Sequence, residues 1–407
     1  MNITKGGVCA AKGFFAAGAE AGVKYQNRKD MALIYSEEPC VCAGTFTTNV
    51  VKAAPVLWDK MVVEKSAFVK AVVVNSGIAN ACTGKEGMDC CEKTAKAAAE
   101  ALKIPADSVL IGSTGVIGMQ IPIDKITAGI EKLAAAKEHS AEAAQSAAGA
   151  IMTTDTVDKQ AAVTFEVGGK TVTMGGMCKG SGMIHPNMCT MLAFVTSDVA
   201  ISKELLTKAV KESIQDTFNM ISVDGDTSTN DTFLFLANGC AGNAEITEEN
   251  ADYEAFKEAL TFLNTTLAKK MAGDGEGATA LFTVEVTGAK TKEDARILSK
   301  SVICSSLTKT AIFGHDANWG RILCALGYSG VVFDPEKVEL FFKGESGCIQ
   351  IFGNGSAVDY SEEEATKILS EKEVTVVVDM HEGNASATAW GCDLSYDYVK
   401  INADYRS

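Results

Sequence analysis

The chain has 407 residues, of which 47% are apolar and 22% are charged, and it carries a formal net charge of −15. A chain of this length can bury a substantial core in one large domain or in two, whereas its acidic charge argues against nucleic acid and anionic membranes as partners, because both select basic surfaces. We recognise no charged-then-apolar leader and no apolar run of membrane-spanning length, so we expect a cytoplasmic protein.

The first 120 residues alternate glycine-bounded apolar segments with polar turns. Strands are predicted at 31–35, 41–48 and 71–74. An alanine-rich helix is predicted over residues 91–103, and the strand that begins at Val109 ends in the sequence GSTG at 112–115. A bend there can aim a hydroxyl and a backbone N–H at one point, which is the geometry of an oxyanion hole. Taken alone, the sequence GSTG is a weak signal, and an ordinary turn is the alternative.

The middle of the chain is predicted to hold a long helix and a hairpin. The alanine-rich helix should span residues 124–152. It ends in Thr153-Thr154-Asp155-Thr156, where hydroxyls beside a carboxylate can simply satisfy loose backbone groups. Two strands follow, at 163–167 and 171–174, and two adjacent glycines at 168 and 169 supply the turn between them.

The next segment, residues 179–194, reads KGSGMIHPNMCTMLAF. The plain interpretation is a buried strand over residues 189–196, because Thr190 is β-branched and its neighbours are apolar. Gly180 and Gly182, however, permit backbone conformations that side chains forbid, and the proline and asparagine at 186 and 187 mark a turn. A strand with such a bent entry can present its first residue instead of only burying it.

The second half continues with helices and polar loops. Ser202 is predicted to cap a helix to about residue 213, and a helix that Thr247 opens should end near residue 271. Between them lies the polar loop 222–231, which lacks the terminal glutamate of a calcium loop and fits a polar substrate rim equally well. Glu276 stands between glycines, a setting in which most such residues are solvated loop charges.

From about residue 279 the chain is predicted to be rich in strands. We expect them at 281–286, 338–342, 348–352, 375–380 and 385–390. Helices are predicted over 294–305, after Trp319, and after the capping box formed by Ser361 and Glu364. The chain ends in the sequence NADYRS at 402–407, a tail without an apolar ending that would normally fray.

Cysteine and histidine spacing argues against a metal centre. Thirteen cysteines and four scattered histidines form no zinc-like cluster. The odd cysteine count instead predicts reduced and mostly buried thiols. We therefore predict no metal and no cofactor.

Several of these segments together resemble the glutamate N-acetyltransferases, also called ornithine acetyltransferases. The segment 179–194 is similar to that family's self-cleavage motif, usually written KGSGMI-x-PN-x-ATMLAF, with Cys189 in place of the usual alanine. The sequences GSTG, TTDT and NADYRS resemble further motifs of the family, and the resemblance runs from about residue 7 to the end. It implies a precursor that cuts itself between Cys189 and Thr190, giving an alpha chain (1–189) and a beta chain (190–407) that assemble as α2β2.

The resemblance also implies a fold and residue roles. The fold would be α/β, a layered sandwich of mixed β-sheets flanked by helices, as in the N-terminal-nucleophile-like aminopeptidases. Thr190 would be the nucleophile, and Thr114 and Gly115 would stabilise the oxyanion. The implied substrate-binding residues are Thr153, Lys179, Thr190, Glu276, Asn402 and Ser407.

The implied reaction moves acetyl from N2-acetylornithine to Thr190 and then to glutamate, with acetyl-CoA as a second candidate donor. A terminal α-amine, with an ordinary pKa of about 7.7–8.0, can accept the hydroxyl proton without a histidine. Two alternatives stay open. One is an N-terminal-nucleophile amidase or aminopeptidase that gives its acyl group to water; the other is a non-catalytic amino-acid-binding protein whose threonine never becomes terminal.

Overall fold

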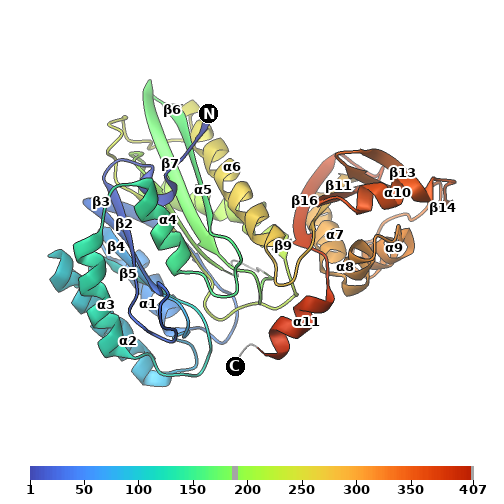
Figure 1. Ribbon diagram of the computed structural model, residues 1–407. Coiled ribbons are helices and arrows are strands. Elements are labelled where there is room, and N and C mark those ends of the chain that lie inside the picture. The colour runs from blue at the N-terminus through green and yellow to red at the C-terminus, as the bar shows by residue number, and fades with distance from the viewer. Residues whose placement is uncertain (186–190, 405–407) are drawn as a thin grey trace. The chain divides into compact units, whose positions relative to one another are not determined.

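The computed structural model describes residues 1–185 and 191–404, and Figure 1 shows its helices and strands. The chain forms two compact units. Unit 1 comprises Met1–Gly180, Pro186–Asn219 and Thr227–Leu267, and unit 2 comprises Ser181–His185, Met220–Asp226 and Ala268–Ser407. These units are defined by packing and not by cleavage, so they do not test the predicted fragments 1–189 and 190–407, which stay a prediction.

Unit 1 is built on a nine-stranded mixed sheet with the order β1-β6-β7-β8-β10-β3-β4-β5, in which β2 also pairs with β3. Its strands are β1 Asn2–Thr4, β2 Phe14–Ala19, β3 Met31–Phe46, β4 Val69–Asn75, β5 Val109–Ser113, β6 Lys159–Val167, β7 Lys170–Lys179, β8 Leu192–Ser197 and β10 Thr232–Ala237. The strands β8 and β10 run parallel and are buried along their whole length. Such continuous burial is typical of strands covered on both faces.

Helices cover this sheet (Figure 1). The helices of unit 1 are α1 Ala54–Lys65, α2 Gly84–Leu102, α3 Ile123–Ala136, α4 Ala141–Ala150, α5 Lys203–Gln215 and most of α6 Ala251–Gly273, with short 3-10 turns at η1 Gly7–Cys9 and η2 Ala106–Ser108; a third turn, η3 Phe218–Met220, reaches the first residue of unit 2. Helix α1 packs against β5, α4 packs against β2, and α5 packs against β3. The buried apolar side chains form one cluster that includes Phe14 and Phe194 and another that includes Met31 and Leu133.

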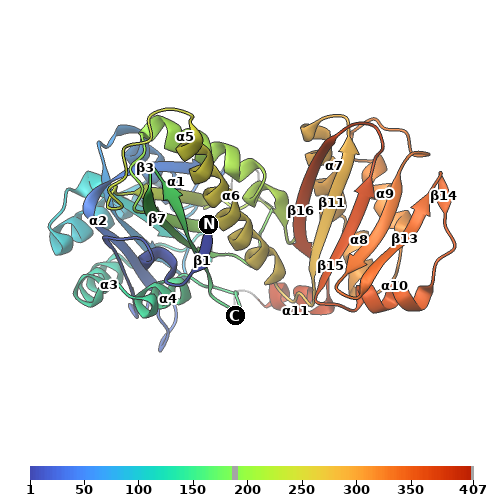
Figure 2. The same ribbon diagram turned by 90° about the horizontal axis from the view of Figure 1, so that it is seen from above.

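Unit 2 holds a seven-stranded sheet with the order β14-β13-β12-β15-β11-β16-β9, and Figure 2 shows its strands side by side. The strands are β9 Ile221–Ser222, β11 Leu281–Ala289, β12 Glu339–Gly344, β13 Gly347–Gly353, β14 Ser356–Ala357, β15 Glu373–Asp379 and β16 Ala385–Cys392. The helices are α7 Lys292–Cys304, α8 Ser306–Phe313, α9 Trp319–Gly327, α10 Glu362–Leu369 and α11 Tyr396–Ala403. Helix α7 packs against β11 and β16.

The predicted fold class, mixed sheets flanked by helices, is confirmed. The predicted hairpin turn and two predicted helix caps are confirmed as well. The hairpin turns at Gly168 and Gly169, which both have positive φ, and the hydroxyls of Ser202 and Ser361 accept hydrogen bonds from the first turns of α5 and α10. Among the described residues, no helix is long and apolar enough to cross a membrane.

The prediction of two strands at 31–35 and 41–48 was wrong, because residues 31–46 form the single strand β3 and residues 47 and 48 lie beyond its end. The pairing of β3 with β4 shifts register between Tyr35 and Cys40. The polar residues between them, which looked like a turn, are therefore accommodated as an irregularity within one strand.

The single helix predicted over 124–152 was also wrong, because α3 and α4 are separate. Between them, the backbone N–H and C=O of Glu138 both bond to Ala16 of β2. Ser140 then caps α4 by accepting a hydrogen bond from the Ala143 N–H. An alanine-rich sequence carries no signal for this break, because the partner strand lies more than 100 residues away.

Other boundaries differ as well. Helix α6 begins at Ala251 and not at Thr247, because the side chain of Asn250 accepts hydrogen bonds from the Asp252 and Tyr253 N–H groups. The helices α1, α8 and α11 were not predicted. The last of these contains Asn402, in a tail that composition alone would leave frayed and to which the family resemblance gives a substrate-binding role.

Candidate active site

Three of the predicted site residues meet at the end of β7 in unit 1. Lys179 is the last residue of that strand and is only 7% exposed. Its Nζ donates to Thr153 Oγ1 at 2.9 Å and to Thr114 Oγ1 at 3.4 Å. A single ammonium group therefore joins hydroxyls from two loops that lie far apart in the sequence.

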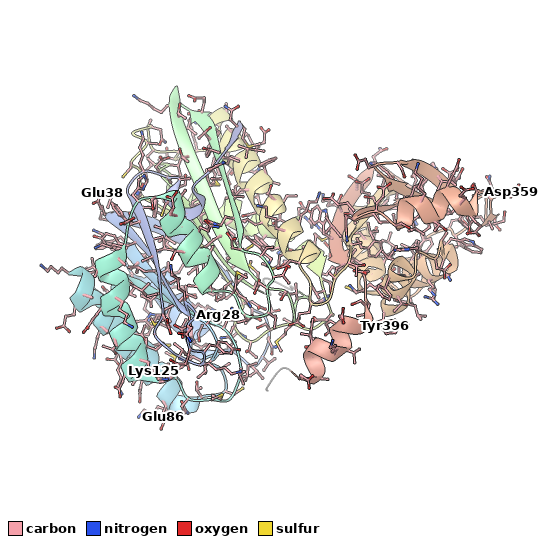
Figure 3. All side chains as sticks on the ribbon, viewed as in Figure 1. Arg28, Glu38, Glu86, Lys125, Asp359 and Tyr396 are labelled. Carbon is pink, nitrogen blue, oxygen red and sulfur yellow. The ribbon has the colours of Figure 1, made fainter. Side chains whose placement is uncertain are left out.

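The Thr153 loop is held from outside by Arg28, which Figure 3 labels. One guanidinium nitrogen of Arg28 donates to the Met152 carbonyl at 2.6 Å and to the Thr153 carbonyl at 3.3 Å. Because both acceptors are main-chain atoms, Arg28 fixes the path of the loop and leaves the Thr153 hydroxyl to Lys179.

A buried carboxylate that the sequence did not reveal underlies this cluster. Asp155 Oδ1 accepts hydrogen bonds from Lys159 Nζ and from the Gly180 N–H, both at 2.7 Å. Its Oδ2 accepts from the Thr153 N–H at 3.0 Å and lies 3.9 Å from Lys179 Nζ. Burial by itself would raise the pKa of Asp155, but Lys179 and Lys159 hold it well below its usual value. The carboxylate is therefore ionised and orients Lys179.

The predicted oxyanion-stabilising residues lie directly after β5. Gly115 has φ +130, and a Cβ there would lie 2.3 Å from the Gly77 carbonyl carbon, so this position requires glycine. The Thr114 N–H donates to Asn75 and the Val116 N–H donates to Gly77. Between them, the Gly115 N–H donates to nothing within residues 1–185 and 191–404. The Thr114 hydroxyl and this N–H, which has no partner among the described residues, are the two donors that the predicted oxyanion hole would use.

The turn that carries Thr114 is fixed by buried amides. Asn230 Nδ2 donates to the Ser113 carbonyl at 2.8 Å, and the Ser113 hydroxyl accepts from the Asn80 N–H at 2.9 Å. Asn80 in turn donates to the Gly87 carbonyl at 2.9 Å. The asparagines of this region therefore hold the turn in place by satisfying buried polar groups.

A second pair of predicted residues meets within unit 2. Asn402 Nδ2, on α11, donates to Glu276 Oε2 at 2.7 Å, and Glu276 is only 6% exposed. The Glu276 N–H donates to the Ser181 carbonyl at 2.8 Å. A Cβ on Gly182 would lie 2.3 Å from the Glu276 carboxyl, so glycine is needed for this close approach. The carboxylate is thus not a solvated loop charge.

Cys189, Thr190 and Ser407 lie outside the described residues. The roles expected of these residues, and of all the other predicted site residues, stay predictions. The chain that follows Thr190 enters β8, where Leu192 pairs with Lys179.

Another buried carboxyl lies near the start of β8. Asp231 directly precedes Thr232, whose N–H donates to the Met191 carbonyl at 2.8 Å. Asp231 is 1% exposed, and its Oδ2 has no hydrogen-bond partner among the described residues. Burial raises the pKa of Asp231 well above its usual value, despite hydrogen bonds from its neighbours. Within the described parts of the chain, no three His, Cys, Asp or Glu side chains form a group that could hold a metal ion.

Comparison with known proteins connects this site to a family. The model of the ArgJ family matches residues 15–407. The arginine biosynthesis bifunctional protein ArgJ 1 of Clostridium acetobutylicum is 52% identical over 394 residues, which cover 97% of this chain and 96% of that protein. The arginine biosynthesis bifunctional protein ArgJ of Symbiobacterium thermophilum is 53% identical over 409 residues, which cover the whole of both chains.

A solved structure is similar to part of this chain. The crystal structure of the arginine biosynthesis bifunctional protein argJ from Bacillus halodurans is 46% identical to it, with a TM-score of 0.50. The match covers 52% of this chain and 97% of the solved chain.

Proposed function

The chain belongs to the ArgJ family, and on this premise we propose that it transfers acetyl from N2-acetylornithine to glutamate through an acetyl ester on Thr190. The observation that carries the proposal is the contact of Lys179 with both Thr114 and Thr153. The family resemblance assigns these three residues, from three separate motifs, to one site, and Lys179 lies within hydrogen-bonding distance of both threonines. The names of the relatives as bifunctional proteins of arginine biosynthesis agree with this reaction.

The proposed nucleophile arises by self-cleavage. Thr190 Oγ1 attacks the carbonyl carbon of Cys189, the peptide C–N bond breaks, and the Thr190 nitrogen takes the hydroxyl proton. The resulting ester is hydrolysed by water, which leaves a carboxylate on Cys189 and a free hydroxyl and α-amine on Thr190. Support comes from the solved relative, because its chain matches over 97% of its own length but over only 52% of this chain. A chain of about half the precursor length is what cleavage near the middle would produce.

In the proposed transfer, the Thr190 hydroxyl oxygen first takes up the acetyl group and then releases it. The α-amine, with an ordinary pKa near working pH, accepts the hydroxyl proton as Thr190 attacks the acetyl carbonyl of N2-acetylornithine. Ornithine leaves, and the amine of glutamate attacks the acetyl ester, so the kinetics are ping-pong. The Thr114 hydroxyl and the Gly115 N–H stabilise the oxyanion in both halves, and the loss of one such donor typically costs about 10²–10³-fold in turnover.

In this proposal, Lys179 and Glu276 bind substrate groups of opposite charge. Lys179, whose ammonium is oriented by Asp155, binds a substrate carboxylate, and Glu276 with Asn402 binds a substrate ammonium group. The Ser407 carboxylate has the same role as Glu276. We further propose that the fragments assemble as α2β2, that the enzyme is cytoplasmic, and that acetyl-CoA serves as a second acetyl donor, for which the word bifunctional in the relatives' names is the support.

The test is N-terminal sequencing of the purified protein and mass analysis after brief exposure to N2-acetylornithine. Thr190→Ala should stay one band on a denaturing gel and take up no acetyl, whereas Cys189→Ala, which restores the residue usual in the family, should be cut and labelled. An active, labelled Thr190→Ala chain would refute the proposal. Product analysis with and without glutamate excludes the amidase alternative if acetylglutamate forms, and native mass analysis of the cut protein tests the α2β2 assembly.

A further inference from the structure

Residues 181–185, here called the arm, follow Lys179 and Gly180 and belong to unit 2. The arm is held mainly through its backbone. The Ser181 carbonyl accepts from the Glu276 N–H at 2.8 Å, and the Ile184 carbonyl accepts from the Val223 N–H at 2.7 Å. These two contacts fix the carbonyl side of the arm but leave its N–H groups to other partners.

The N–H groups of the arm are held by one carboxylate. Asp224 Oδ2 accepts from the Met183 N–H at 2.6 Å, and Asp224 Oδ1 accepts from the Ile184 N–H at 2.9 Å. The Tyr398 hydroxyl of α11 donates to Asp224 Oδ2 at 3.2 Å. The Asp224 side chain is half-buried, and it accepts hydrogen bonds from two adjacent main-chain N–H groups and from the Tyr398 hydroxyl. It therefore anchors the arm and is not a loose loop charge.

The arm needs such an anchor because its backbone is strained. Met183 has φ +55, in the left-handed region that non-glycine residues rarely occupy. Met183 is 44% exposed, so packing buries only part of the residue that has this conformation. A conformation of this kind persists only when its surroundings over-determine it, and the charge-assisted hydrogen bonds from Asp224 supply that determination.

We propose that Asp224 is a positioning residue for self-cleavage, because it fixes the arm whose chain leads into the Cys189–Thr190 bond. The inference rests on the proposed function and deepens it. The attack requires the Thr190 hydroxyl to reach the Cys189 carbonyl carbon at about 3–3.5 Å, and a misplacement of about 1 Å can cost 10²-fold in rate. On the far side of the bond, the pairing of Leu192 with Lys179 already fixes the chain. Asp224 fixes the backbone at Met183 and Ile184, which precede the bond in the chain.

Asp226 provides a matched control on the same loop. It carries the same charge two residues away and is exposed, and its carboxylate accepts no hydrogen bond from the arm among the described residues. Asp226→Asn therefore removes a charge from the loop without removing an arm contact. Asp224→Asn removes the charge and also places an amide NH₂, which is a donor, against N–H groups that are themselves donors.

The experiment follows scission of newly synthesised full-length chain by cell-free translation and denaturing gels. Asp224→Asn should be cut at least about tenfold more slowly than wild type, while Asp226→Asn should be cut at the wild-type rate. Asp224→Glu, which keeps two acceptor oxygens, should be cut faster than Asp224→Asn. A purely steric role predicts the reverse order, because asparagine matches aspartate in size and glutamate does not.

Transfer activity separates positioning from a general structural role. After long incubation, acetyl transfer per cut molecule of Asp224→Asn should match that of wild type, because the anchor acts before the cut. An equal loss of transfer per cut molecule would overturn the inference, as would wild-type scission in Asp224→Asn or an equal delay in Asp226→Asn. An uncut wild-type chain would overturn both this inference and the proposed function, whereas a cut wild type with a normal Asp224→Asn overturns the inference alone.

Hydrogen exchange tests the anchor even if Asp224→Asn fails to fold. In the uncut Thr190→Ala precursor, the Met183 and Ile184 amides should exchange far more slowly than those of an unstructured chain. Exchange at the unstructured rate would show that the carboxylate does not hold the arm before the cut, and would overturn the inference.

Discussion

The most direct test of the site's electrostatics is Asp155→Asn. The Asp155 and Lys159 side chains are both 0% exposed and lie 2.7 Å apart, and Lys179 is also nearly buried. The substitution keeps the size of the side chain but takes the negative charge of Asp155 away from two buried ammonium groups. Removal of one partner from a buried ion pair typically destabilises a protein by about 3–5 kcal/mol. For a unit of this size that corresponds to a fall of roughly 10 °C in melting temperature.

The pH dependence of this effect has a definite sign. The pKa of Asp155 is depressed in the folded protein, so its contribution to stability is present above the ordinary pKa of about 3.9 and is lost as the pH falls through the folded value. The gap in melting temperature between wild type and Asp155→Asn should therefore be full at neutral pH and should narrow below about pH 4. Calorimetry at a series of pH values measures it.

The chain offers an exposed acid–lysine pair as a control. Glu92 and Lys96 have the same spacing of four residues, and their charged atoms lie 2.5 Å apart, but their side chains are 55% and 66% exposed. Glu92→Gln should leave the melting temperature unchanged, because water screens exposed pairs. In contrast, the double variant Asp155→Asn, Lys159→Met should recover part of the lost melting temperature, because it also removes the buried positive charge of Lys159. An Asp155→Asn protein that melts like Glu92→Gln would refute the reasoning.

Three further predictions concern single residues. Asp59→Asn should melt higher than wild type at pH 7 and lose that advantage near pH 4, because burial raises the pKa of Asp59 and one of its oxygens has no partner among the described residues; a lower melting temperature at pH 7 would contradict this. Gly115→Ala should reduce the rate of acetyl transfer by a factor of about 10² or more. Its control is Gly118→Ala, which is also at positive φ but has no atom within 4 Å of the new Cβ, and which should cost only about 1–2 kcal/mol of backbone strain. Equal turnovers of the two variants would contradict the oxyanion assignment. Asn402→Ala should raise KM for the amino-acid substrates more than it lowers kcat, because it removes the partner of Glu276; a fall in kcat at constant KM would argue against a binding role.

Features decided by neighbouring residues could be predicted from the sequence. The hydroxyls of Ser202 and Ser361 stand directly before apolar helical patterns, and both cap helices as expected. The glycine pair at 168 and 169 fixed the hairpin, because positive φ at both positions is cheap only for glycine. In each case the interaction spans at most three residues, so local chemistry was sufficient.

Features decided by distant partners could not be predicted in this way. The break between α3 and α4 depends on pairing of Glu138 with Ala16. Residues 31–46 extend as one strand because β4 pairs with the first part of it and β10 with the second. The burial of Lys159 was invisible as well, since a lysine before a strand usually faces water. The family resemblance, and not residue patterning, selected Lys179 and Thr153 together, which lie in contact.

Three carboxylates lie against the residues that precede Thr190. Asp155 holds the Gly180 N–H, Glu276 lies against Gly182, and Asp224 holds the Met183 and Ile184 N–H groups. The Asp155 and Asp224 carboxylates bind main-chain N–H groups, so they constrain the backbone path whatever the arm's exposed side chain is. The two glycines admit that path sterically and the carboxylates determine it electrostatically. Under the proposed self-cleavage, the Thr190 hydroxyl therefore has a second requirement, which is a preceding backbone that acidic side chains hold in a conformation it would not adopt alone.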